Sequence, residues 1–217
     1  MNIITLLILA PPILIALVVH EFSHALAAYR FGDNTAKLNG RLTLNPLAHL
    51  DLMGTVMIFL VRFGWAKPVP VNPSNLKNPK QDMLWISLAG PLSNMILACI
   101  SGTFLRLMHD MGVQSGSGSL AGILFYMLLY SLQINLALAV FNLLPVAPLD
   151  GSKILFGLVP KAYERYALWV ERYGPPLLFG LIILSYTSRV SVFGWFIWPF
   201  VDFFSKLFTS PSLKVFE

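Results

Sequence analysis

The chain has 217 residues, of which 56% are hydrophobic and only 12% charged, and its net charge is +5. Soluble domains average about 45–50% apolar and about 25% charged residues. The composition therefore excludes an ordinary soluble domain, which must cover its surface with polar groups. The 15 basic residues form no dense run, so they indicate membrane orientation and lipid headgroup contact, and no nucleic-acid binding. Apolar stretches close to membrane-spanning length occupy 3–19, 83–105, 120–144 and 175–198.

The first predicted helix runs from residue 3 to about residue 29. No basic residue precedes its apolar run and no small-residue cleavage site follows, so we expect a mature helix and not a signal peptide. Apolar and polar side chains alternate over 36–44, which is typical of a short β-hairpin or edge strand. The apolar run at 52–63 is too short to span a bilayer, and its length favours a re-entrant half-helix.

A proline-containing loop at 64–82 separates this region from two further predicted spanning helices, at about 83–107 and 120–143. Proline lacks an N–H group and breaks helices, so the second of these helices ends before Pro145. Residues 152–173 are expected to contain a half-helix and an aromatic, mixed-charge segment at the membrane interface.

The last apolar region, 175–200, is expected to span once. These elements predict an all-α integral membrane protein, a polytopic helical bundle with a short β-hairpin and a re-entrant segment. The whole chain, 1–217, is expected to form a single domain. Its core lies at about 3–155 and a C-terminal membrane region at 175–217.

Basic residues predict the orientation in the cell membrane. If 52–63 does not cross, the loops at 30–82 and 153–173 lie on one side of the membrane. These loops hold most of the 15 basic residues, and cytoplasmic loops are enriched in Lys and Arg. We therefore expect this side, and the functional site near it, to face the cytoplasm, with the N-terminus outside.

Residues 20–24 read His-Glu-Phe-Ser-His and match the HExxH pattern. Positions i and i+4 share one face of a helix, so His20 and His24 can bind one ion, and Glu21 can act as a general base toward water there. They are the only acidic, basic or histidine side chains before Arg30, and such groups within a membrane segment point to function. The alternative is a polar helix end at the membrane surface.

A catalytic zinc site takes three protein ligands and keeps one position open. No Glu occurs between Glu21 and Glu164, which excludes a glutamate ligand shortly downstream. The remaining candidates are Asp33, Asp51, Asp82, Asp110 and Asp150. Asp150 is favoured, because the third helix returns it to the depth of the histidines in a segment whose prolines and glycine force irregular backbone, whereas Asp110 falls on the opposite side. The alternative is a simple turn aspartate, since Asp-Gly is a common turn pair.

Three motifs together resemble the site-2 protease family of intramembrane zinc metalloproteases. They are HExxH near the start, Gly-Pro-Leu-Ser-Asn at 90–94, and Asn-x-x-Pro-x-x-Pro-Leu-Asp-Gly at 142–151. The resemblance covers about residues 15–155 and matches a compact prokaryotic form without a PDZ or CBS domain. It implies that one zinc ion is held by His20, His24 and Asp150, and that Glu21 is the catalytic base.

The same resemblance implies hydrolysis of peptide bonds in transmembrane segments of membrane protein or peptide substrates within the lipid bilayer. Because a helix hides its carbonyl groups, the substrate must unwind locally, and the predicted strand at 36–44 could pair with it. Two alternatives are a zinc-binding membrane protein without proteolytic activity and an ion or proton transporter. A transporter predicts repeat symmetry between the halves, which the sequence does not display.

Four other polar residues are candidates for supporting roles. Asparagines at the positions of Asn94 and Asn142 assist at the site in similar proteins, where an amide can donate to a developing oxyanion or orient a ligand. The alternative for both is an amide that packs helices together. His49 and Asp51 lie in 41–51, which also resembles a segment of compact bacterial members, and they could contact the ligands or line the entrance. Their alternative is a solvated turn.

Overall fold

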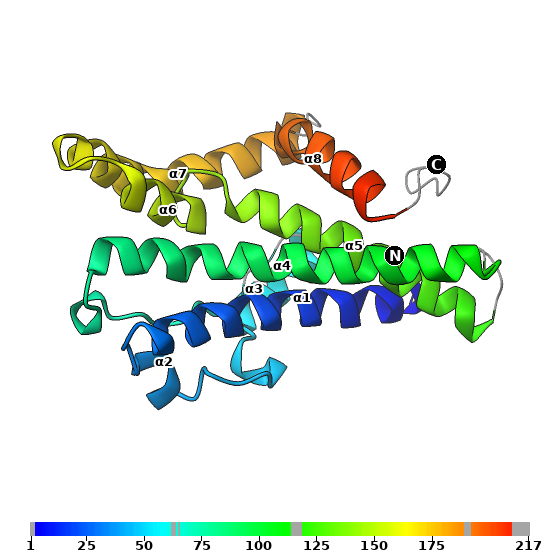
Figure 1. Ribbon diagram of the computed structural model, residues 1–217. Helices are drawn as coiled ribbons and strands as arrows, with labels where there is room; N and C mark the ends of the chain where they lie inside the picture. Colours follow the sequence, from blue (N-terminus) through cyan, green and yellow to red (C-terminus); the bar gives the residue numbers. More distant parts are fainter. Residues whose placement is uncertain (1–2, 62–63, 65, 114–118, 189–191, 210–217) are drawn as a thin grey trace.

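The computed structural model describes residues 3–61, 64, 66–113, 119–188 and 192–209. The described chain is almost entirely helical (Figure 1). Its α-helices are α1 (Ile3–Arg30), α2 (Thr35–Leu38), α3 (Leu52–Val61), α4 (Pro79–Asp110), α5 (Leu120–Asn142), α6 (Asp150–Leu158), α7 (Glu164–Ser188) and α8 (Val192–Phe208). Single 3-10 turns lie at Pro46–Ala48, Pro73–Asn75 and Lys161–Tyr163.

Four helices in the described part of the chain, α1, α4, α5 and α7, are long and apolar enough to cross a membrane. This confirms the predicted polytopic helical membrane protein. The last predicted span, 175–200, is divided between two helices. The aromatic segment before it is helical and continues through Pro175 and Pro176 as α7, so the helix begins at Glu164, well before the predicted start.

Helix α4 lies at the centre of the bundle and contacts α1, α5, α6 and α8 (Figure 1). Helices α1 and α5 run in the same direction and antiparallel to α4. Apolar side chains of α4, α5 and α8 form the main core: Ala98, Leu105, Phe125, Leu132, Leu136 and Val201. The C-terminal ends of α1 and α5 therefore meet at the same end of the bundle, where α6 begins.

The predicted β-hairpin at 36–44 is wrong. Residues Thr35–Leu38 form one helical turn, and the Asp33 carboxylate accepts the Thr35 backbone N–H at 3.0 Å just before it. Gly40, at φ +66°, then reverses the chain. Of the described residues, only Leu50 and Ala66 form an antiparallel bridge, and it is isolated. A strand is therefore not available at 36–44 to pair with a substrate.

The short apolar run predicted at 52–63 forms α3 over Leu52–Val61, and residues 62–63 lie outside the described part of the chain. The side chain of Asp51 accepts the Gly54 N–H at 2.7 Å and caps this helix. Nothing in the structure supports the predicted re-entrant path of this segment.

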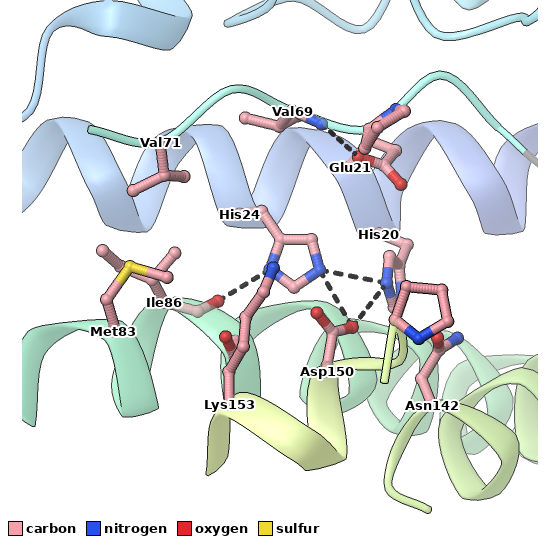
Figure 2. A pocket seen from close by; sticks show the side chains of 13 residues that line it. His20, Glu21, His24, Val69, Val71, Met83, Ile86, Asn142, Asp150 and Lys153 are labelled. Carbon is pink, nitrogen blue, oxygen red and sulfur yellow. Dashed lines mark hydrogen bonds and ion pairs between the residues drawn. The ribbon is translucent and has the colours of Figure 1, made fainter. Parts of the chain in front are cut away.

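An extended segment, residues 66–72, runs alongside α1 next to the HExxH sequence and is called here the cover segment (Figure 2). At one end, the Lys67 N–H donates to the His49 carbonyl at 2.9 Å, and the Lys67 carbonyl accepts from the Arg41 guanidinium. At the other end, the Asn72 N–H donates to Asp33 at 2.7 Å. The loop between α2 and α3 and the corner that follows α1 thus hold the cover segment near its two ends.

Asp33 is fully buried and accepts hydrogen bonds from Thr35, Asn72 and Asn75. Burial raises the pKa of its carboxyl group, but these hydrogen bonds outweigh it and hold the pKa below its ordinary value. Because the folded-state pKa is lowered, the carboxylate stabilises the fold at pH values above its unfolded pKa of about 4. That contribution is lost as the pH falls through the folded-state pKa.

We expect Asp33→Asn to destabilise the protein by about 2 kcal/mol at pH 7, because the new amide group places N–H donors against the donors that the carboxylate accepted. Thermal unfolding of the purified protein in detergent measures this loss. The difference from wild type should narrow at acidic pH, where Asp33 itself is protonated.

The control is Asp202→Asn, which removes an exposed pair with Lys206. An exposed i,i+4 pair contributes only about 0.3–0.5 kcal/mol. Equal losses in the two variants would contradict the role assigned to Asp33.

Candidate metal centre

Three side chains from distant parts of the chain meet at one point between α1, α4 and α6 (Figure 2). The Nε2 atoms of His20 and His24 lie 3.0 Å apart. The Asp150 Oδ2 atom lies 3.1 Å from the first and 3.2 Å from the second. All three residues are buried. The structure therefore brings together the three residues predicted to bind the metal.

The local backbone explains how each side chain reaches this point. His20 and His24 are one turn apart on the same face of α1. Asp150 is the first residue of α6, after the irregular stretch that follows α5. Gly151 packs against the carbonyl groups of Leu143 and Leu144 so closely that a Cβ atom there would lie within 2.5 Å of backbone. Glycine thus lets the start of α6 fold back against the end of α5.

Both imidazoles use their second ring nitrogen as a donor. His24 Nδ1 lies 2.7 Å from the Ile86 carbonyl oxygen, and His20 Nδ1 lies 2.6 Å from Asn94 Oδ1. A neutral imidazole that donates at Nδ1 carries only a lone pair at Nε2. The central point is therefore surrounded by the lone pairs of two imidazoles and one carboxyl group.

Electrostatics favour a cation at this point. Asp150 contributes a carboxylate oxygen to the same buried point as the two Nε2 atoms. Two lone pairs and an anion about 3 Å apart repel one another unless a positive charge lies between them. Two imidazoles and one carboxylate also form a ligand set that catalytic zinc sites use. The residues present fit a zinc ion.

Gly90 of α4 leaves the space that the two rings occupy. A Cβ atom at this position would lie 2.6 Å from His20 Cε1 and closer still to His24 Nε2. Real Cβ contacts are essentially never that short. The close approach of α4 to the HExxH face of α1 therefore requires glycine.

Glu21 lies beside the metal-binding group and faces the cover segment. Its carboxylate accepts the Val69 N–H at 3.1 Å (Figure 2). Pro68 and Pro70 flank Val69 and have no N–H groups of their own. The ligands, Glu21, Asn142 and Lys153 line a cavity of about 130 Å³, which the cover segment bounds on one side.

The other predicted site residues occupy different places. The Asn142 side chain lines the cavity and donates to the Leu138 carbonyl at 3.0 Å. Asn94 is fully buried behind the His20 ring and does not line the cavity. His49 is also buried outside the cavity lining, where its Nε2 lies 2.8 Å from the Thr43 carbonyl oxygen. Asp51 caps α3, as described above.

Sequence reasoning missed the groups that hold the predicted residues. The Ile86 carbonyl and the Val69 N–H are backbone atoms, so no residue type could indicate them. Asn135, which contacts Asn94, is a polar residue inside an apolar helix, and that position alone could have marked it.

A helical membrane protein with a buried His-His-Asp group built on HExxH belongs to the class of membrane-embedded metallopeptidases. Residues 104–184 match the family model of peptidase family M50. The chain is also 41% identical over 210 residues to the Bacillus subtilis protein named "Putative zinc metalloprotease YwhC", with 93% of each chain covered. It is therefore a member of peptidase family M50, the site-2 protease family of zinc metalloproteases.

Other relatives are more distant. A protein of the same description, Rip2 of Mycolicibacterium smegmatis, is 30% identical over 198 residues, which cover 88% of this chain and 71% of that protein. Zinc metalloprotease MJ0392 of Methanocaldococcus jannaschii is 26% identical over 150 residues, covering 69% of this chain and 33% of that protein. No solved structure matches the chain.

We expect Gly90→Ala to weaken zinc binding at least about 10-fold, since the new methyl group must displace one or both imidazoles and the orientation of ligands controls metal affinity. Competition with a chelator of known affinity measures the dissociation constant. Gly180→Ala is the matched control, because a Cβ atom at that helical position meets nothing within 4 Å. Zinc affinity equal to wild type in Gly90→Ala would contradict the assigned geometry.

Proposed function

We propose that the chain hydrolyses peptide bonds within transmembrane segments of membrane protein substrates. In this proposal His20, His24 and Asp150 bind one zinc ion and Glu21 is the general base. The observation that carries it is the convergence of the three ligand atoms within 3.2 Å of one another beside the Glu21 carboxylate, which lines the same cavity. Membership of peptidase family M50 supports the reaction type.

When bound, zinc supplies Lewis acidity, which lowers the pKa of water to about 7 and polarises the scissile carbonyl group. The Glu21 carboxylate accepts a proton from the attacking water and later delivers it to the leaving amine. Asn142, whose amide lines the cavity, donates a hydrogen bond to the oxygen that becomes negatively charged. His20 and His24 keep their hydrogen bonds at Nδ1 throughout. Both imidazoles and the Asp150 carboxylate act only as metal ligands.

The size of the site favours an unwound substrate. The cavity of about 130 Å³ has room for a few water molecules. An α-helix with its side chains is about 10–12 Å across, so an intact transmembrane helix does not fit. The substrate therefore enters as extended backbone, and the cover segment moves aside to admit it.

We also propose that the site faces the cytoplasmic side. The loop before α4 and the start of α7 lie together, since Lys80 Nζ contacts Glu164 at 2.9 Å and the Val159 carbonyl at 2.6 Å. The loops that meet here carry most of the basic residues of the chain, and such loops stay in the cytoplasm. The start of α1 then lies outside.

Cleavage of a model transmembrane substrate in detergent or proteoliposomes tests the proposed roles. We expect Glu21→Gln to lower kcat about 10²- to 10⁴-fold, the usual contribution of a general base, while the protein still binds one zinc ion. Asp150→Asn should lose both zinc and cleavage, because a neutral amide replaces the anionic ligand.

The matched control is Glu171→Gln, which makes the same change at an exposed position of α7 and should cleave like wild type. Cleavage by Glu21→Gln at the wild-type rate would remove the base from the mechanism. Full zinc content in Asp150→Asn would remove that residue from the ligand set.

Cysteine labelling tests the orientation. Cys99 is the only cysteine, so a Cys99→Ser background allows single reporters at Lys77 and Met111, which are both exposed. In intact spheroplasts, a membrane-impermeant maleimide should label Met111→Cys at once and Lys77→Cys only after permeabilisation. The reverse pattern would place the metal centre at the outer side.

A further inference from the structure

Polar side chains extend from His20 into the interior between α1, α4 and α5. Asn94 on α4 and Asn135 on α5 are both fully buried, and Ser101 and Ser131 continue the polar contacts beyond them. Burial of an amide without a hydrogen-bond partner costs several kcal/mol in an apolar environment. The contacts of these amides are therefore expected to be directional, with each donor facing an acceptor.

A backbone carbonyl fixes the orientation of the Asn135 amide. Its Nδ2 group lies 2.8 Å from the Ser131 carbonyl oxygen, which can only accept. The NH2 side of the Asn135 amide must therefore face Ser131. Its Oδ1 atom consequently faces the neighbouring helix, where it lies 2.8 Å from Asn94 Nδ2.

The orientation of the Asn94 amide follows from that of Asn135. Its Nδ2 group donates to Asn135 Oδ1 and, at 3.2 Å, to the Ala16 carbonyl oxygen. A reversed Asn94 amide would place Oδ1 against these two acceptors. Its Oδ1 atom must therefore point to His20 Nδ1, 2.6 Å away, and it can only accept a hydrogen bond from that nitrogen.

The result is that His20 carries its proton on Nδ1 and presents the Nε2 lone pair to Asp150 and His24. The hydrogen bond at one ring nitrogen decides which nitrogen of a histidine binds metal. His24 reaches the same tautomer directly, because a backbone carbonyl, that of Ile86, accepts from its Nδ1. His20 instead donates to a side chain, that of Asn94, which is itself oriented by the Asn135 side chain.

We propose that Asn135 is a positioning residue for the metal centre: acting through Asn94, it holds His20 in the tautomer and ring orientation that binds zinc. This proposal rests on the proposed function, because it takes His20 as a zinc ligand. It also assigns Asn94 a role different from oxyanion support. Both hydrogen-bonding sides of the Asn94 amide are engaged away from the cavity.

Zinc affinity of the purified full-length protein tests the proposal. We expect Asn135→Leu, a change of similar volume, to weaken zinc binding about 10- to 100-fold, as loss of a hydrogen-bond partner behind a metal-binding histidine does. Asn135→Asp should retain most of the affinity. In this variant the carboxylic acid stays neutral, because burial favours the uncharged form. It can donate to the Ser131 carbonyl and accept from Asn94, so both hydrogen bonds of the wild-type amide are kept.

Cobalt substitution supplies a readout that packing alone does not move. The visible absorption of bound Co²⁺ reports the number and type of its ligands. We expect an altered spectrum for Asn135→Leu at saturating Co²⁺, and the wild-type spectrum for Asn135→Asp. Where Asn135→Leu does not assemble in the membrane, Asn135→Ala removes the same acceptor without adding an apolar side chain.

Two controls separate the possible outcomes. Ser101→Ala removes a buried hydroxyl from the same polar region, where Ser101 contacts Ser131 at 2.8 Å outside the path to His20. It should bind zinc like wild type. His20→Ala should lose zinc.

Equal weakening in Ser101→Ala and Asn135→Leu would assign the effect to packing and overturn the proposal. Equal weakening in Asn135→Asp and Asn135→Leu would overturn the directional account. Wild-type affinity in Asn135→Leu with loss in His20→Ala would overturn this proposal and leave the proposed function intact. Zinc retained by His20→Ala would instead overturn the metal centre itself.

Discussion

Mutual repulsion of three electron-rich atoms is the constraint around which this end of the bundle is arranged. Two imidazole nitrogens and a carboxylate oxygen lie 3.0 to 3.2 Å apart in a buried place. Such an arrangement persists only if the surrounding structure holds each group and a cation balances them. Gly90 allows α4 to approach the rings, and Gly151 allows α6 to fold back against α5. Both glycines thus allow the helices to bring the two imidazoles and the Asp150 carboxylate together.

The side chains around this point are held by two different parts of the backbone, a packed helix and an extended segment. His24 is tied to the backbone of α4 through Ile86, and Glu21 to the backbone of the cover segment through Val69. The first link lies within a packed helix pair, whereas the second lies in an extended segment of the chain. The His24 ring is therefore fixed by the helix bundle, while the position of Glu21, the proposed base, is coupled to the cover segment.

The sequence was sufficient to predict most of the membrane-spanning helices and the three residues that meet at the candidate metal centre. The i,i+4 histidines and the apolar lengths of α1, α4 and α5 follow from helix geometry. The prediction from the alternation over 36–44 was wrong, since a helical turn forms there beside the buried Asp33 carboxylate, whose hydrogen bonds to Thr35 and to the distant Asn72 depend on tertiary structure. The hydrogen bond between Val69 and Glu21 could not be predicted from the sequence for the same reason, because it joins a backbone atom to a side chain 48 positions away.

A polar path through an apolar bundle is compatible with stability only when it is complete. Asn135, Asn94 and His20 each donate to one neighbour and accept from another, or present a lone pair to the metal. Replacing one of them by an apolar residue leaves its neighbour unpaired in the interior, which costs more than the lost hydrogen bond itself. The path distributes the constraint on His20 over α1, α4 and α5, so the three helices that form the bundle are also the ones that orient this ligand.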